Sequence, residues 1–166
     1  MTRTFVAKTK DGYDVYVDLE KSHASTHLHD HPELLELTKE VLLKHEFKAD
    51  SGKFEFDMGR EIGMTDLVET TPGDDIFYAK RPNREKYTRF VRGKEATFTN
   101  WITIGLEKSN EAEYDLYTVF IGRITPSFPY GKEDMNGNNR TFWETHALVV
   151  GNQEFFSDTV TTECPW

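Results

Sequence analysis

The sequence predicts an α+β fold: a mostly antiparallel β-sheet with one long helix in the N-terminal half and a short helix near the C-terminus. Apolar residues follow helical spacing from residue 34 to 42, and from residue 53 onward they alternate with polar ones, as in strands with one buried face. Aromatic residues make up 13% of the chain, which suits a sheet with packed faces. At 166 residues, we expect a single domain over positions 1–166.

A β-hairpin and then the long helix are expected first. Strands at 4–8 and 13–19 flank a turn made by Lys10, Asp11 and Gly12. Asp30 can cap the helix, Pro32 suits its first turn, and Glu33 completes a capping box with Asp30. The helix is expected to run to about His45, with an apolar face made of Leu34, Leu35, Leu37, Val41 and Leu42.

The remainder of the chain is expected to build most of the sheet. Alternation predicts strands at 53–58, 62–69, 75–80, 87–92, 97–107 and 114–124. Residues 125–139 are rich in Pro, Gly and Asn and are expected to form a loop of the kind that often borders sites. A short helix capped by Asn139 or Thr141 should run through Val149, and residues 154–161 should add a last strand. The strand order is not predicted.

The composition indicates a cytoplasmic protein that does not enter a membrane. No apolar run approaches the length that crosses a bilayer, and the first residues have no apolar core of a secretory signal. Cys164 is the single cysteine, so no internal disulfide can form. The net charge of −9 argues against general coating of nucleic acid, although an enzyme with one local basic cleft remains compatible with it.

The positive charge is concentrated in one window, residues 80–94. Seven of the twenty Lys and Arg residues lie there beside a single acid, Glu85, so the window carries +6 while the remainder carries −15. Guanidinium groups bind phosphate oxygens bidentately, and the window therefore indicates an anion site, with Arg84 and Arg89 as the favoured pair. The alternatives are an exposed strand whose charges keep an edge soluble and a structural ion-pair network around Arg81, Lys86 and Lys94.

His146 is the candidate for proton transfer. On a helix it would share a face with Phe142 and Trp143, which lie four and three residues earlier. An imidazole titrates near neutrality and can move protons in a reaction. The alternative is a histidine that is hydrogen-bonded in the core.

Two further groups are weaker candidates. His23, His27, His29 and His31 lie within nine residues, but their spacing matches no known zinc motif, so we expect a solvated loop with no metal and no cofactor; one of these histidines could still transfer protons. A second group lies on the last long strand and its exit, where packing is the first explanation for Tyr117 and Thr118, and Arg123 could reach a ligand.

Motif searches narrow the function. The phosphate-binding GxxxxGK[ST], the dinucleotide-binding GxGxxG, the nucleophile elbow GxSxG and a cysteine nucleophile are all absent from the sequence. Hydrolysis by a P-loop and dinucleotide redox chemistry are therefore not expected.

The stretch from residue 75 to 150 resembles uncharacterised proteins of bacterial and mobile-element genomes. The matching pieces are Arg84 with Tyr87-Thr88-Arg89-Phe90, the long strands 101–106 and 117–122, Pro126 or Pro129, and the ending Phe142-Trp143-Glu144-Thr145-His146-Ala147-Leu148-Val149. Some such proteins resemble the small ribonucleases of the barnase, EndoU, colicin and RelE group. The resemblance implies metal-independent cleavage of RNA on a sheet face.

Two functions are carried forward. In a ribonuclease, His146, Arg89 and Thr118 would be catalytic, and the substrate would be RNA or another phosphate-bearing ligand contacted by Arg81, Arg84, Arg92, Tyr117 and Arg123. The alternative is a non-catalytic binding or regulatory protein that docks an anionic partner through residues 80–94.

Overall fold

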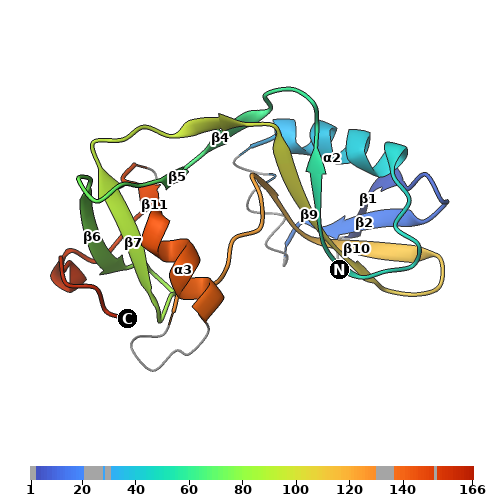
Figure 1. Cartoon of the computed structure of the whole chain (residues 1–166). Helices are drawn as coiled ribbons and strands as arrows, with labels where there is room; N and C mark the ends of the chain where they lie inside the picture. Colours follow the sequence, from blue (N-terminus) through green and yellow to red (C-terminus); the bar gives the residue numbers. More distant parts are fainter. Residues whose placement is uncertain (1–2, 21–27, 29–30, 130–136, 152) are drawn as a thin grey trace. The chain divides into compact units, whose positions relative to one another are not determined.

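The computed structural model describes every residue except 1–2, 21–27, 29–30, 130–136 and 152 (Figure 1). The chain divides into two compact units. The first comprises Met1–Gly63 and Thr99–Ile124, and the second comprises Met64–Phe98 and Thr125–Trp166. The expectation of a single domain stays a prediction, and each unit is described below by itself.

Among its described residues, the first unit combines a five-stranded sheet with the helix Glu33–Lys44. Its strands lie in the order β1 (Arg3–Lys8), β2 (Asp14–Asp18), β10 (Glu113–Ile121), β9 (Trp101–Lys108) and β3 (Gly52–Asp57). All neighbours are antiparallel except β2 and β10. Helix α2 (Glu33–Lys44) contacts β1 and β10. Its apolar face and the alternate residues of the strands form one core, which includes Leu34, Val41, Leu42, Val15, Val17, Ile102, Ile104 and Leu106.

The second unit contains the residues of the basic window and His146. Its four strands lie in the order β5 (Leu67–Glu69), β11 (His146–Val149), β7 (Tyr87–Arg92) and β6 (Asp75–Lys80). β11 pairs antiparallel with β5 and parallel with β7, and β7 pairs antiparallel with β6. Helix α3 (Gly137–Thr145) leads directly into β11, and a 3-10 turn η1 (Ser157–Thr159) lies near the end.

Alternation along β7 gives this second sheet two packed faces. Val91 packs with Val68, Ala147 and Val149, whereas Phe90 packs with Phe77 and Ala79 and with the partly buried Leu148 and Phe155. The short strands β4 (Gly63–Thr65) and β8 (Thr97–Thr99) pair with each other.

The α+β class and the strand-rich composition of the fold are confirmed, but the prediction of a long helix is wrong. Helix α2 has 12 residues and no side-chain cap at Pro32. It ends because His45 is extended (φ −124°, ψ 149°) and its ring lies 4.5 Å from that of Phe56 on β3. The predicted cap, Asp30, lies outside the described residues.

The C-terminal predictions also need correction. The short helix stops at Thr145, and the four residues that follow form β11, because this segment is hydrogen-bonded to strands on both sides. In place of a strand at 154–161, the structure has η1 and one isolated bridge, in which Tyr78 and Thr161 exchange hydrogen bonds of 2.8 and 2.9 Å.

Two of the predicted strands are divided. The segment 62–69 forms β4 and β5 with Asp66 between them, and 97–107 forms β8 and β9 with Asn100 between them. The carbonyl groups at both breaks are used elsewhere, since Asp66 O accepts from Val149 N and Asn100 O accepts from Met58 N, each over 2.8 Å. Within the described part of the chain, no helix is both long enough and apolar enough to pass through a bilayer.

Candidate functional site

The turn between β6 and β7 holds two guanidinium groups. Arg81, Pro82, Asn83 and Arg84 form a β-turn in which Arg84 N donates to Arg81 O over 3.2 Å and Asn83 has a left-handed φ of 60°. Proline at the second position and a residue with positive φ at the third are typical of a type II turn. The sequence therefore dictates that the two arginines occupy the first and last positions of one tight turn.

Arg81 is held in place by neutral groups. Its Nε donates to the hydroxyl of Thr88 over 2.8 Å, and its guanidinium carbon lies 5.9 Å from the ring centre of Phe128. Burial, and then the positive charge of Arg84, lower the pKa of Arg81 below its ordinary value. Among the described residues, no carboxylate forms an ion pair with Arg81 or Arg84.

Arg89, in contrast, points into the second unit and is 8% exposed. Its Nη1 donates to the hydroxyl of Thr70 and to the main-chain carbonyl of His146, both over 2.8 Å. Its Nε finds no hydrogen-bond acceptor among the described residues. Arg89 lies opposite Tyr78 in the pairing of β7 with β6. Burial and then Cys164 raise the pKa of the Tyr78 phenol, whereas the hydrogen bonding and positive charge of Arg89 act to lower it. Arg89 and Arg84 therefore do not form the shared surface pair that the sequence favoured.

Other cations of the window are matched by acids. Arg92 forms an ion pair with Asp75 at 3.6 Å and covers the ring of Phe77 at 4.0 Å. Lys94 forms an ion pair with Asp74 at 3.1 Å, and its Nζ also donates to the carbonyl of Glu69 over 3.1 Å. For Lys94 the structure agrees with the structural ion-pair alternative, whereas Arg92, which was expected to contact a substrate, is paired with Asp75.

His146 is the first residue of β11, and its ring is fixed by the last turn of α3. Nδ1 lies 2.9 Å from the carbonyl oxygen of Phe142, and the two rings stack at 4.0 Å with an interplanar angle of 5°. The predicted neighbourhood with Phe142 is thus present, although His146 itself is not helical. Nδ1 also lies 3.0 Å from the hydroxyl of Thr145. A carbonyl oxygen only accepts, so Nδ1 serves the Phe142 contact as a donor, and in that tautomer Nε2 carries the lone pair of the neutral ring.

The other ring nitrogen faces a carboxylate. Glu69 lies opposite His146 in the pairing of β5 with β11, and its Oε1 lies 4.0 Å from Nε2. The side chain of Glu69 is 88% exposed and that of His146 is 22% exposed, so both remain accessible from solvent.

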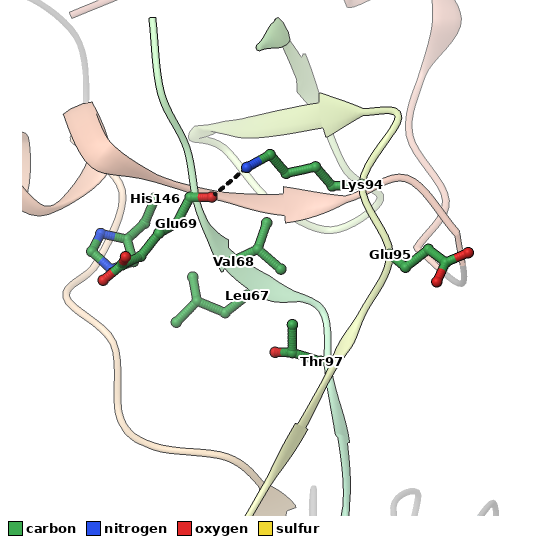
Figure 2. A pocket seen from close by; sticks show the side chains of 7 residues that line it. All are labelled: Leu67, Val68, Glu69, Lys94, Glu95, Thr97 and His146. Carbon is green, nitrogen blue, oxygen red and sulfur yellow. Dashed lines mark hydrogen bonds and ion pairs between the residues drawn. The ribbon is translucent and has the colours of Figure 1, made fainter. Parts of the chain in front are cut away.

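These two residues line an open pocket of about 610 Å³ (Figure 2). The remaining lining consists of Leu67, Val68, Lys94, Glu95 and Thr97. Figure 2 shows the imidazole beside the Glu69 carboxylate and the Lys94 chain extended to the Glu69 carbonyl. The pocket thus brings together one imidazole, the carboxylates of Glu69 and Glu95, and the ammonium of Lys94.

Three predicted site residues belong to the first unit. Tyr117 and Thr118 lie at a β-bulge of β10, where they face Gly105 of β9. Arg123 donates from Nε to Glu55 over 3.1 Å and covers the ring of Trp101 at 4.0 Å. Packing and ion pairing therefore account for these side chains within their own unit.

Of the four clustered histidines, the structure describes His31. His23, His27 and His29 lie outside the described residues, and His31 is exposed, with Nδ1 3.4 Å from Glu33. In the part of the chain that the structure describes, no three His, Cys, Asp or Glu side chains are grouped as metal ligands would be.

Sequence reasoning missed Glu69. One acid among 29 carries no signal by itself, and its relation to His146 depends on the pairing of β5 with β11, two segments separated by more than seventy residues. Searches with family models, with curated proteins and with solved structures found no match for this chain.

Proposed function

We propose that the second unit cleaves phosphodiester bonds of RNA without a metal, with His146 as the proton-transfer residue. The observation that carries the proposal is the contact of 2.9 Å between His146 Nδ1 and the Phe142 carbonyl, which leaves Nε2 directed to the pocket as a base. The stacked Phe142 ring supports the same orientation.

The chemistry would proceed by internal transfer. His146 Nε2 would take the proton of a ribose 2′-hydroxyl, and the 2′-oxygen would attack phosphorus as the bond to the 5′-oxygen breaks. Products would be a 2′,3′-cyclic phosphate and a 5′-hydroxyl, the latter protonated by water. Glu69, 4.0 Å from Nε2, would stabilise the imidazolium that forms.

Two neighbours would support this step. Lys94 places an ammonium at the pocket, and two of its three protons are used by Asp74 and by the Glu69 carbonyl, which leaves one for a phosphate oxygen. Arg89 would act as a positioning residue, since it binds the main-chain carbonyl of His146 from inside the unit.

The experiment compares wild-type protein with His146→Asn on labelled single-stranded RNAs of several sequences, with and without EDTA. We expect cleavage that survives EDTA, yields cyclic phosphate ends, and falls at least about 100-fold in the variant. His45→Asn is the matched control, because His45 lies in the first unit, where its ring is 4.5 Å from that of Phe56. Loss of cleavage in EDTA, equal cleavage by His146→Asn, or no cleavage of any RNA would each refute the proposal.

A second candidate function is the docking of an anionic partner through residues 80–94. The observation in its favour is that Arg84 is exposed and that neither Arg84 nor Arg81 is paired with an acid among the described residues. Binding of an anionic polymer such as heparin that is lost in Arg84→Met, in a protein that cleaves no RNA, would support this candidate over the first.

A further inference from the structure

The turn Arg81–Arg84 carries two positive charges that form no ion pair with the described residues. The side chain of Arg84 makes no hydrogen bond with the described residues, and the guanidinium of Arg81 makes one, from its Nε to Thr88. Because a guanidinium carries five N–H donors, nine donors of the pair remain available. Two cations held at the ends of one turn repel each other, and a shared anion removes that repulsion.

The turn is also rigid in the way that a binding site requires. Pro82 fixes the backbone at its second position, and Asn83 adopts the left-handed conformation that closes the turn through the bond from Arg84 N to Arg81 O. Arg81 is anchored on Thr88, which is 1% exposed. Little side-chain freedom of Arg81 is therefore lost when a ligand binds.

Further packing supports the position of Arg81. Its guanidinium lies over one side of the Phe128 ring, and the ring itself stacks on Trp143 at 3.9 Å with an interplanar angle of 20°. Trp143 is 1% exposed, and its Nε1 donates to the carbonyl of Pro126 over 3.0 Å. Phe128 and Trp143 thus support one side of the Arg81 guanidinium, and its Nη atoms make no hydrogen bond with the described residues.

We propose that the turn Arg81–Arg84 is a binding site for a phosphate monoester dianion. The proposal narrows the second candidate function to one turn and one class of ligand, and it does not require cleavage at His146. A monoester phosphate offers three terminal oxygens and a charge near −2 at neutral pH, which matches two guanidinium groups. A phosphodiester has two free oxygens and a single charge, so we expect it to bind more weakly.

The experiment measures binding of inorganic phosphate, phenyl phosphate and diethyl phosphate by calorimetry and by NMR titration of the full chain. We expect phosphate and phenyl phosphate to bind with dissociation constants of roughly 1 mM or tighter, and diethyl phosphate at least about 10-fold more weakly. In Arg84→Met, affinity for phenyl phosphate should fall at least about 10-fold. Because Arg84 is exposed, this variant should fold as the parent does.

Arg60→Met serves as the control of equal charge change, since Arg60 belongs to the first unit and is paired with Glu40. Its affinity for phenyl phosphate should match that of the parent. The proposal is overturned by no binding of phenyl phosphate at about 20 mM, by equal affinity in Arg84→Met, or by equal binding of the diester. Heparin binding without phenyl phosphate binding would refute this site while leaving the broader docking function in place.

Discussion

Arg89 Nη1 donates to the main-chain carbonyl oxygen of His146 over 2.8 Å, and this bond joins residues 57 positions apart in the sequence. The same atom donates to Thr70 Oγ1 over 2.8 Å. Arg89, which the sequence predicted as a surface cation, thus connects the residue after β5 with the first residue of β11 through hydrogen bonds inside the unit.

Arg89→Ala should destabilise the second unit by about 2 to 4 kcal/mol, because it removes two buried hydrogen bonds and leaves a cavity. Unfolding in urea, followed by the fluorescence of the three tryptophans, measures the change. Arg84→Ala is the matched control, since that side chain is exposed, and it should change stability by less than about 0.5 kcal/mol. Equal unfolding midpoints for the two variants would show that Arg89 has no such structural role.

Gly105→Ala should destabilise the first unit by about 1 to 3 kcal/mol. A Cβ there would lie 2.6 Å from Thr118 Cγ2 and 2.7 Å from Tyr117 Cζ, so the bulge of β10 would have to shift. The change is measured as the unfolding midpoint in urea.

Gly73→Ala provides the comparison for Gly105→Ala, because a Cβ at Gly73 meets no atom within 4 Å. Replacing Thr118 with Ser in the Gly105→Ala background removes the nearer clash and should recover part of the loss. A Gly105→Ala variant as stable as Gly73→Ala would mean that the close approach of β9 and β10 is absent.

Tyr114→Phe should change stability by less than about 1 kcal/mol, because the buried hydroxyl forms no hydrogen bond of ordinary geometry among the described residues and only the Ala49 N–H approaches it. The ring would keep its edge contacts with Tyr13 and Phe47 at 5.1 and 6.3 Å. Thermal unfolding of the two proteins measures the difference. A loss of more than about 1 kcal/mol would indicate a hidden partner for the hydroxyl.

The ionisation of Tyr114 also predicts that the free energy of unfolding falls at high pH. Burial, and then the neighbouring Tyr13, Asp11 and Asp50, raise the pKa of Tyr114 from 10.0 to about 12. The folded state therefore keeps a proton that the unfolded chain releases, so the contribution is complete below pH 10 and is lost as the pH rises toward 12. Between these values, the free energy of unfolding should fall more steeply for the parent than for Tyr114→Phe.

The ionisation of Glu40 predicts that the free energy of unfolding falls at low pH. Hydrogen bonds from Arg60 and then Lys44 lower the pKa of Glu40 from 4.5 to about 2. Its contribution is therefore present above pH 4.5 and is lost as the pH falls toward 2. Glu40→Gln should be less stable than the parent at pH 7 by less than about 1 kcal/mol, because the cluster is near solvent.

Urea midpoints of both proteins at pH 7, 4.5 and 2.5 test the role of Glu40, and the difference between them should shrink at the lowest pH. Adding 1 M salt at pH 7 should shrink it as well. A difference that is independent of pH would assign the effect to packing.

The sequence by itself was sufficient to predict the strands and turns whose signals lie within a few neighbouring residues. Strands β6 and β7 have the predicted bounds, since alternation, the Pro82-Asn83 turn and the burial of Phe90 all act within a few residues. The hairpin β1–β2 was likewise predicted by its turn. The spacing of four residues predicted that His146 lies beside Phe142. The two residues are in contact in the structure, although the helix ends one residue before His146.

Only the tertiary structure decided which cations are free and what lies beside His146. In the sequence, Arg84 and Arg89 are two equivalent cations of one basic window. In the structure, β7 is paired on both sides and Arg89 points inward to the His146 carbonyl, whereas Arg84 ends a turn and is exposed. Glu69 reaches His146 through the pairing of β5 with β11, and Arg123 is neutralised by Glu55, 68 positions away. Such relations depend on strand order, which arises from the packing of the whole unit rather than from the preference of any segment.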